Sequence, residues 1–454
     1  MEKQELIAAY KNFLDKGKTE RECVAEIIKT AEKYGYKNLD TVEKIKAGDK
    51  VYIQKMNKSI ALFKIGSEDL KNGLVILGAH IDSPRLDIKQ NPLYERDFAA
   101  YLNTHYYGGI KKYQWVTLPL AIHGVVCKTD GSVVNVKIGE DENDPVFCIS
   151  DILPHLAHKQ MKDSAAEFIP GEKLDLIAGT VIPSKESDSK ESKDEKQNDS
   201  HSAKKMVLKI LKEKYNIEAN DFLSAELEVV PAGKSRDCGF DGSLILGYGQ
   251  DDRVCAFTSF QALMDSEESG KTLCCLCVDK EEIGSVGGTG MASHLFENMV
   301  SKLIEKAHGA SGYSDFIVRS CLENSFMLSS DVNAAYDPQN GDLYDKDNAS
   351  FLNGGVVFNK YTGSRGKSGA SDANAEYLAK VRNIMEKNGV KYQMAELGKV
   401  DQGGGGTIAL YAAKYGMNVL DAGVAVLSMH APWELTAKED ILQAYNCYKA
   451  FLSI

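Results

Sequence analysis

Short apolar runs that end in acidic or histidine side chains recur along this chain. Two of them, 74–80 (LVILGAH) and 273–278 (LCCLCV), contain no acidic or basic residue before the end of the run. Continuous apolar runs of about four to eight residues are typical of strands buried on both faces, as in parallel sheets covered by helices. Similar runs precede Asp251, Asp331 and His430. The pattern predicts an α/β protein with a doubly wound mixed sheet.

Apolar positions at helical spacing mark amphipathic segments at both ends of the chain. They predict helices over residues 3–15 and 19–34 and a last helix within 437–454. Residues 51–56 and 59–66 alternate between apolar and polar side chains, which predicts two paired strands.

The middle of the chain has a different pattern, with short runs typical of strands and few segments of helical periodicity. We interpret residues 93–233 as a mainly β domain inserted between the two parts of an α/β domain, 1–92 and 234–454. Within the insertion, residues 184–205 are charged, rich in serine and almost without apolar side chains. Such a segment cannot bury enough apolar area to offset its ordering entropy, so we predict a disordered surface loop.

Length and charge narrow the class of protein. A chain of 454 residues is longer than one ordinary core supports, which favours two domains. A net charge of −11 argues against a nucleic-acid-binding surface. No apolar run of about 18 residues predicts a membrane span, and the charged N-terminal segment lacks the pattern of a signal peptide. Together with scattered cysteines, these features favour a cytoplasmic protein with reduced thiols.

Residues 276–290 (LCVDKEEIGSVGGTG) place two adjacent carboxylates, Glu281 and Glu282, at the end of a buried strand. In open α/β sheets ligands bind beyond the carboxyl ends of the strands. Adjacent carboxylates repel each other, so a cation between them or a retained proton is expected. A metal site explains the pair, with one Glu as ligand and the other handling protons. An exposed acidic turn is the simpler alternative for this stretch taken alone.

The same juxtaposition of apolar run and polar side chain occurs five times. The residues are His80 and Asp82, Asp251 and Asp252, Glu281 and Glu282, Asp331, and His430. Histidine and carboxylate ligands suit zinc, manganese or cobalt. The set exceeds what one tetrahedral ion takes and suits two ions with a bridging carboxylate. Each member alone has an ordinary explanation, a helix cap or a core histidine, and adjacency does not decide between Asp251 and Asp252.

Five segments together carry a family resemblance: GAHIDSPRLDIK, GYGQDDRVCAF, DKEEIGSVGGTG, SSDVNAAYDP and SMHAPWE. In order and spacing they resemble the M18 family of metalloaminopeptidases, the aspartyl aminopeptidase group of the dinuclear zinc peptidase clan. The resemblance implies a zinc metalloaminopeptidase that removes N-terminal residues from peptides. It also implies that the inserted domain serves dimerisation and that the chain assembles into a tetrahedral homo-dodecamer.

Residue by residue, the resemblance implies two divalent metal ions per chain, zinc first and cobalt or manganese as alternatives. Asp251 would bridge the ions, and the peptide bond that follows it would be cis. His80 and Asp331 would complete the shell of one ion, and Glu282 and His430 that of the other.

The resemblance also assigns residues outside the metal shell. Glu281 would be the general base, and Asp82 would fix the tautomer of the His80 imidazole. His155, in the inserted domain, matches a family position directed at an active site and would contact substrate, with His158 as its rival.

Specificity for the first substrate residue stays open. An acidic side chain needs a cation, which Lys360, Arg365 and Lys367 could supply. Ala334 replaces a histidine of eukaryotic-type members of the family, which argues against a strict acidic preference. Residues 403–406 (GGGG) lack the G-K-[ST] of a phosphate-binding loop and predict a tight strand-to-helix turn lining the pocket.

Two alternatives to an aminopeptidase remain at this point. One is an N-acyl deacylase or carboxypeptidase of the same clan, with the same metal centre. The other is a non-catalytic, self-assembling scaffold whose site is vestigial.

Overall fold

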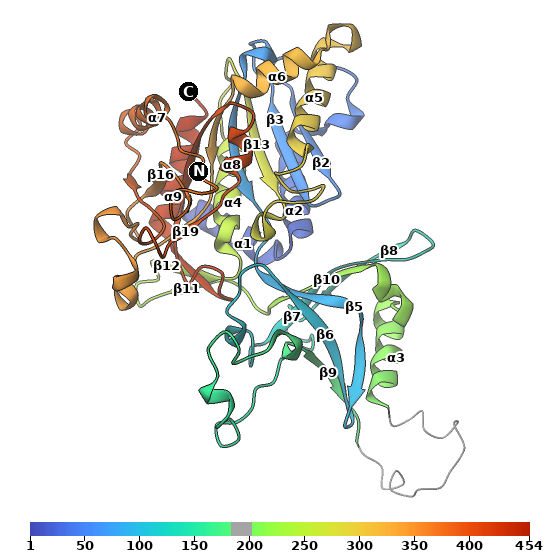
Figure 1. Ribbon diagram of the computed structural model, residues 1–454. Coiled ribbons are helices and arrows are strands. Elements are labelled where there is room, and N and C mark those ends of the chain that lie inside the picture. The colour runs from blue at the N-terminus through green and yellow to red at the C-terminus, as the bar shows by residue number, and fades with distance from the viewer. Residues whose placement is uncertain (183–201) are drawn as a thin grey trace, which may run out of the picture. The chain divides into compact units, whose positions relative to one another are not determined.

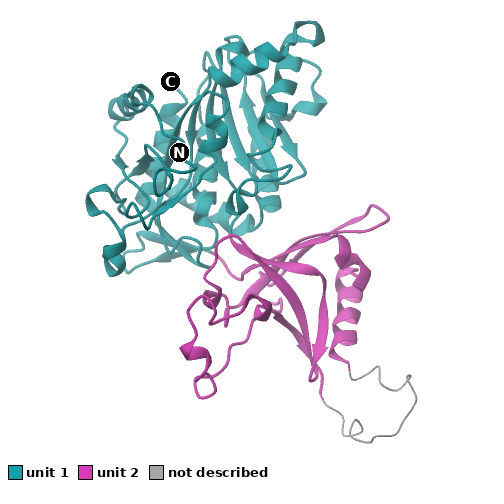
Figure 2. Ribbon diagram, in the orientation of Figure 1, with its two compact units in different colours: residues 1–83, 235–454 teal, residues 84–234 magenta. Residues whose placement is uncertain are grey.

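The computed structural model describes residues 1–182 and 202–454. The chain divides into two compact units, one made of residues 1–83 and 235–454 and the other of 84–234 (Figure 2). The sequence places the first boundary after residue 92. Strand β5 (Arg85–Arg96) runs across that position and pairs with β6 (Ala99–Tyr107), so residues 85–92 belong to the sheet of the second unit.

A nine-stranded mixed sheet forms the centre of the first unit in the described residues (Figure 1). In spatial order its strands are β1 (Lys37–Asn38), β2 (Lys50–Lys55), β3 (Ser59–Lys64), β13 (Thr272–Val278), β4 (Leu74–His80), β14 (Phe326–Ser329), β20 (Asn418–Gly423), β16 (Val356–Asn359) and β18 (Tyr392–Met394). The four neighbours β13, β4, β14 and β20 are parallel. Their carboxyl ends therefore lie along one edge of the sheet.

Helices cover both faces of this sheet, and each face has its own hydrophobic core. One core receives α1 (Lys3–Lys16), α2 (Glu20–Lys33), α4 (Gln250–Met264), α7 (Ala375–Lys387) and α9 (Lys438–Phe451). The other receives α5 (Leu295–His308), α6 (Asp315–Glu323) and α8 (Ala409–Ala413).

The alternation of side chains along β4 and β13 explains why both strands are apolar throughout. Val75 and Leu77 face the first core, whereas Leu74 and Ile76 face the second. The cysteine-rich strand β13 divides in the same way, because successive side chains of a strand point to opposite faces. All ten cysteines are free thiols.

A second, five-stranded sheet of the first unit carries two further segments of interest. Its spatial order is β11 (Arg236–Cys238), β12 (Leu244–Gly247), β22 (Glu434–Ala437), β21 (Ala425–Leu427) and β15 (Asn333–Ala334). Strand β12 leads into α4, and β21 leads to the turn before β22. Two strands β17 (Gly363–Ser364) and β19 (Gly404–Gly405) form a small separate ribbon.

The second unit contains a six-stranded antiparallel sheet in its described residues. Its order is β8 (Val133–Ile138), β7 (Leu120–Cys127), β10 (Ala225–Pro231), β5, β6 and β9 (Leu176–Thr180). Helix α3 (Ala203–Tyr215) contacts β5, β6 and β9.

The predicted disordered loop, 184–205, lies outside the described residues except at its end. There the prediction is wrong for residues 202–205, because α3 begins at Ala203 and the Ser202 side chain accepts a hydrogen bond from the Lys205 N–H. Serine is a favoured residue at this capping position. Among the described residues, no helix has both the length and the apolar character needed to cross a membrane.

Candidate metal centre

The candidate residues reach one place from two sheets. His80 ends β4, Glu281 and Glu282 follow β13, and Asp331 follows β14, all at the carboxyl edge of the large sheet. Asp251 lies at the start of α4, after β12, and His430 follows β21. The five strand ends recognised in the sequence therefore belong to two different sheets, which the sequence pattern does not distinguish.

Asp251 lies between the two histidines. Its Oδ1 is 3.1 Å from Nε2 of His80, and its Oδ2 is 3.3 Å from Nε2 of His430. Nε2 of His430 is also 3.5 Å from Oε2 of Glu282, and Nε2 of His80 is 3.9 Å from Oδ1 of Asp331. One carboxylate thus contacts both imidazoles, and each imidazole has a further carboxylate beside it. The peptide bond between Asp251 and Asp252 is cis.

The centre concentrates negative charge in a buried place. Burial raises the pKa of Glu282 and of Asp331 well above the ordinary range of carboxyl groups, and raises the pKa of Glu281 to about 7. Burial also acts upward on Asp251, but the neighbouring His430 and His80 hold its pKa below the usual value. Carboxylates that are crowded and desolvated in this way are stabilised by a bound cation.

The donor set fits a metal ion. Ligand atoms of His80, Asp251 and Glu282 lie within 4.8 Å of one another, and so do those of His80, Asp252 and Asp331. Oε1 of Glu282 is buried and has no hydrogen-bond partner, which leaves a lone pair for a cation. The second group contains Asp252 rather than Asp251. Asp252 is fully buried and its Oδ2 accepts a hydrogen bond from the N–H of His80, whereas Asp251 contacts both imidazoles.

Asp82 has a second task beside the predicted contact with His80. Its Oδ1 lies 3.4 Å from Nδ1 of that imidazole, and its backbone oxygen lies 3.1 Å from the same nitrogen. The two carboxylate oxygens also accept hydrogen bonds from the N–H groups of Glu281 and Glu282, at 3.1 and 3.2 Å. Asp82 therefore fixes the backbone of the single helical turn Glu281–Ile283 as well as the histidine ring.

The loop after this turn needs glycine at its end. A Cβ placed on Gly290 would lie 2.1 Å from the carbonyl oxygen of Ser285. The Ser285 N–H donates in turn to the carbonyl oxygen of Lys280 at 2.6 Å. The glycine-rich sequence is thus explained by close backbone packing within the loop that follows Glu282.

Glu434 is a site residue that sequence reasoning missed. This buried side chain accepts hydrogen bonds from the N–H of Asp251 at 3.1 Å and from the N–H of His430 at 2.8 Å. Burial raises its pKa to about 8. Its position in the SMHAPWE segment, four residues after His430, was the available signal. Ser83, to which the sequence assigned no role, donates from its hydroxyl to the carbonyl oxygen of Asp251 at 2.7 Å.

The residues predicted to contact substrate belong to both units. His155 and His158 are exposed residues of the second unit. Lys360 forms an ion pair with Asp372. Lys367 also pairs with Asp372, at 3.0 Å.

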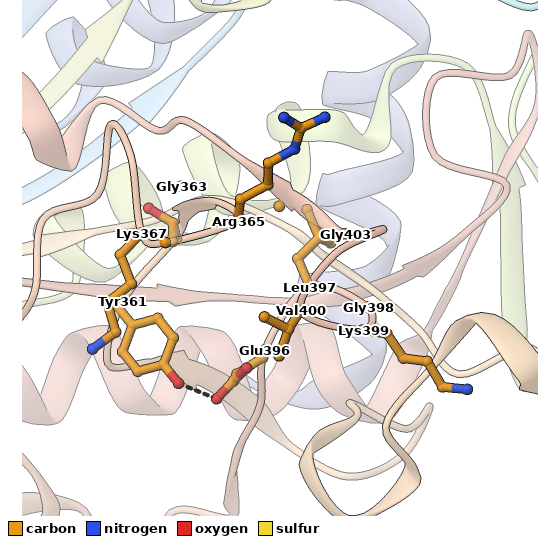
Figure 3. A pocket seen from close by; sticks show the side chains of 13 residues that line it. Tyr361, Gly363, Arg365, Lys367, Glu396, Leu397, Gly398, Lys399, Val400 and Gly403 are labelled. Atoms are coloured by element: carbon orange, nitrogen blue, oxygen red, sulfur yellow. Dashed lines mark hydrogen bonds between the residues drawn. The ribbon is translucent and has the colours of Figure 1, made fainter.

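Arg365 lines a cavity of about 340 Å³ in the first unit. Other lining residues include Tyr361, Leu397, Val400 and Gly403. In Figure 3 the charged ends of Arg365 and Lys399 point outward, whereas the Tyr361 hydroxyl points to Glu396, with which it forms a hydrogen bond.

The glycine run 403–406 connects this cavity with the large sheet. Gly403 and Gly404 line the cavity, and β19 pairs with β17. The Thr407 hydroxyl then donates to Oδ1 of Asp421 at 2.7 Å. Asp421 lies in β20 opposite Ser329 of β14, two residues before Asp331. The structure has a short strand, β19, followed by α8 at this place, as the predicted strand-to-helix turn requires.

Comparison with known proteins identifies the family of this chain. The family model of the aminopeptidase I zinc metalloproteases (M18) matches residues 13–452. The probable M18 family aminopeptidase 1 of Clostridium acetobutylicum is 56% identical over 448 residues, which is 98% of this chain and 93% of the relative. That of Thermotoga maritima is 44% identical over 443 residues, covering 98% of this chain and 94% of the relative. The chain belongs to the M18 family.

Solved structures confirm the fold class. The crystal structure of the M18 aminopeptidase from Thermotoga maritima has a TM-score of 0.92 at 43% identity, covering 100% of this chain and 97% of that one. Aminopeptidase I from Clostridium acetobutylicum has a TM-score of 0.88 at 53% identity, covering 98% and 94%. The mixed α/β fold and the M18 resemblance predicted from the sequence are both confirmed. The protein is an M18 aminopeptidase, a family described as zinc metalloproteases.

Replacement of Glu434 by alanine is expected to weaken zinc binding about 10- to 100-fold, because groups that orient metal ligands typically contribute that much. The N–H groups of Asp251 and His430 lose their acceptor. Competition with a chromophoric chelator measures the affinity. Glu439→Ala, which removes a surface ion pair with Lys3, is the control. Equal zinc affinity of Glu434→Ala and the unaltered protein would contradict the assigned role.

A methyl group at Gly423 is expected to disturb the Asp331 side of the centre. Its Cβ would lie 1.7 Å from the carbonyl oxygen of Asp331, and backbone cannot yield as a flexible side chain does. Gly423→Ala should therefore lower both bound zinc, measured by elemental analysis, and the melting temperature. Gly366→Ala, where an added Cβ meets nothing within 4 Å, should retain both. Full zinc content in Gly423→Ala would rule out the constraint.

Proposed function

We propose that this M18 aminopeptidase holds two divalent metal ions, zinc in the first place, with Asp251 as the shared ligand. His80 and Asp331 complete one side, and Glu282 and His430 the other. The observation that carries this proposal is the position of the Asp251 carboxylate, with one oxygen beside each imidazole. Cobalt or manganese would suit the same ligands.

When bound, the metal supplies a Lewis acid that polarises the scissile carbonyl and favours ionisation of the attacking water. Glu281 takes the proton of that water and delivers it to the leaving amine. Burial raises the pKa of Glu281 to about 7. Asp82 holds the Glu281 backbone in place through the N–H contact described above.

Removal of single residues from the N-terminus requires recognition of a free α-amine. A carboxylate of the centre that the metal ions do not take up would hold this cationic amine. A blocked N-terminus lacks that charge and would be refused. The family match favours this exopeptidase over the deacylase, carboxypeptidase and scaffold alternatives.

For the first substrate residue, we propose that the cavity lined by Tyr361, Leu397 and Val400 accepts its side chain and that neutral residues are preferred to acidic ones. Asp372 supports this preference, because it already pairs with both Lys360 and Lys367. The predicted substrate cations thus have an internal partner, and Arg365 points outward from the cavity. Acidic first residues, for which the sequence left the preference open, would be less favoured than neutral ones.

We also propose self-association through residues 84–234 to dimers and to a tetrahedral dodecamer, with His155 or His158 contacting substrate. A yeast M18 protein, mApe1, has been solved as a dodecamer; it shares 21% identity and a TM-score of 0.75 with this chain. Light scattering would give the assembly size of the purified protein. A cytoplasmic location and peptide substrates complete the proposal.

The Glu281→Gln variant is expected to lose about 10²- to 10⁴-fold in kcat, the usual contribution of a general base, while it retains its metal. Hydrolysis of leucine p-nitroanilide and elemental analysis measure the two properties. Glu305→Gln, an exposed position on α5, is the matched control. Removal of metal with a chelator should abolish activity in all proteins, and added zinc should restore it except in Glu281→Gln. Full activity of Glu281→Gln at intact metal content would show that another group is the base.

The Asp372→Asn variant is expected to shift specificity toward acidic residues, because it releases the charges of Lys360 and Lys367. The ratio of kcat/KM for glutamyl and leucyl p-nitroanilides should rise at least about fivefold, as one newly exposed charge interaction contributes on the order of 1 kcal/mol. Asp347→Asn changes an exposed acid outside residues 360–372 and should leave the ratio unchanged. An unchanged ratio in Asp372→Asn would show that Asp372 and its two lysine partners do not determine specificity.

A further inference from the structure

The turn that carries Glu281 is restrained unevenly. On its inner side the carboxylate of Asp82 accepts two backbone hydrogen bonds. On its outer side Ile283 is 48% and Val286 70% exposed, so little apolar packing holds the loop. Segments with few buried contacts open locally at low free energy. The position of the proposed base, Glu281, therefore depends on the few polar contacts that hold this turn.

One such contact comes from α8. The hydroxyl of Tyr411 donates a hydrogen bond to the carbonyl oxygen of Gly284 at 2.9 Å. Gly284 directly follows the helical turn of Glu281, and its N–H donates back to the Glu281 carbonyl oxygen at 2.9 Å. The Tyr411 hydroxyl thus contacts the residue that closes the turn of the base.

Helix α8 is itself well anchored. Ala409 and Ala412 are buried in the second core, and the half-buried ring of Tyr411 packs against that core. Just before the helix, Thr407 is bonded to the buried Asp421. Tyr411 therefore joins an exposed loop to a fixed part of the sheet. The same helix continues the glycine segment that lines the cavity of Figure 3.

We propose that Tyr411 is a positioning residue for the general base, acting through the carbonyl oxygen of Gly284. The inference rests on the proposed role of Glu281. Tyr411 lies outside the metal ligands and the cavity lining, and none of the sequence motifs contains it. Its hydroxyl contacts the residue at the C-terminal end of the turn, while Asp82 accepts from the first two N–H groups, so the two together restrain the backbone that carries Glu281.

The Tyr411→Phe variant tests the proposal, because it removes one oxygen atom and keeps the ring. Loss of one hydrogen bond between neutral groups is expected to lower kcat for leucine p-nitroanilide about three- to tenfold, with KM and zinc content unchanged. In hydrogen–deuterium exchange, peptides that cover residues 280–290 should exchange faster, both with zinc and without it. Exchange elsewhere in the large sheet should not change.

Tyr415→Phe is the matched control. Tyr415 is also half-buried against the second core, four residues further on, and its hydroxyl forms no hydrogen bond within the described residues. This variant should match the unaltered protein in kcat and in exchange over residues 280–290.

The outcomes separate the two proposals. Unchanged kcat and unchanged exchange in Tyr411→Phe would overturn the positioning role, and so would an equal loss in Tyr415→Phe. If the unaltered protein had no aminopeptidase activity, the proposed function would fail, but faster exchange over 280–290 in Tyr411→Phe would still support the restraint. A loss of kcat accompanied by loss of zinc would show a structural effect on the centre instead.

Discussion

The contact of one carboxylate, that of Asp251, with two imidazoles is the interaction on which the rest of the centre depends. It requires that elements of two sheets end at one point, because His80 closes a strand of the large sheet and His430 follows a strand of the small one. Neighbouring side chains restrain the backbone of Asp251 through hydrogen bonds. Glu434 accepts a hydrogen bond from the N–H of Asp251, and the Ser83 hydroxyl donates one to the carbonyl oxygen of Asp251.

Charge balance is the second constraint. Several carboxyl groups share a buried volume, and burial alone would drive them to hold protons at neutral pH. A divalent cation removes that conflict, and the unpartnered buried oxygen of Glu282 shows where the protein offers a lone pair. Metal binding and the stability of the folded centre are therefore coupled, since carboxylates that lose their cation remain desolvated and repel one another. Burial likewise raises the pKa of Glu281, which lies beside these carboxyl groups, to about 7.

Local patterns in the sequence selected side chains that the fold brings together, because each of them follows an apolar run. The pattern could not show that β12 and β21 pair with β22 rather than with the large sheet, since strand pairing depends on contacts far apart in the chain. Glu434 escaped notice because, taken alone, it is an ordinary acid within a short strand, and its two N–H partners are supplied by the fold. The pairing of Lys360 with Asp372 was equally hidden, as a lysine in a loop gives no sign of its partner.

The restraints at the centre differ in kind, and the difference follows from what each residue has to do. The ligand side is held by buried acids, Asp252 and Glu434, whose carboxylates bind the backbone of His80, Asp251 and His430. The proposed base lies in a turn with exposed apolar residues, whose backbone is bonded to Asp82 and to Tyr411. Metal ligands must stay fixed throughout a reaction cycle, whereas a residue that carries a proton from water to a leaving amine must reach two positions. A turn fixed at its backbone, with its outer face toward solvent, allows that side-chain movement.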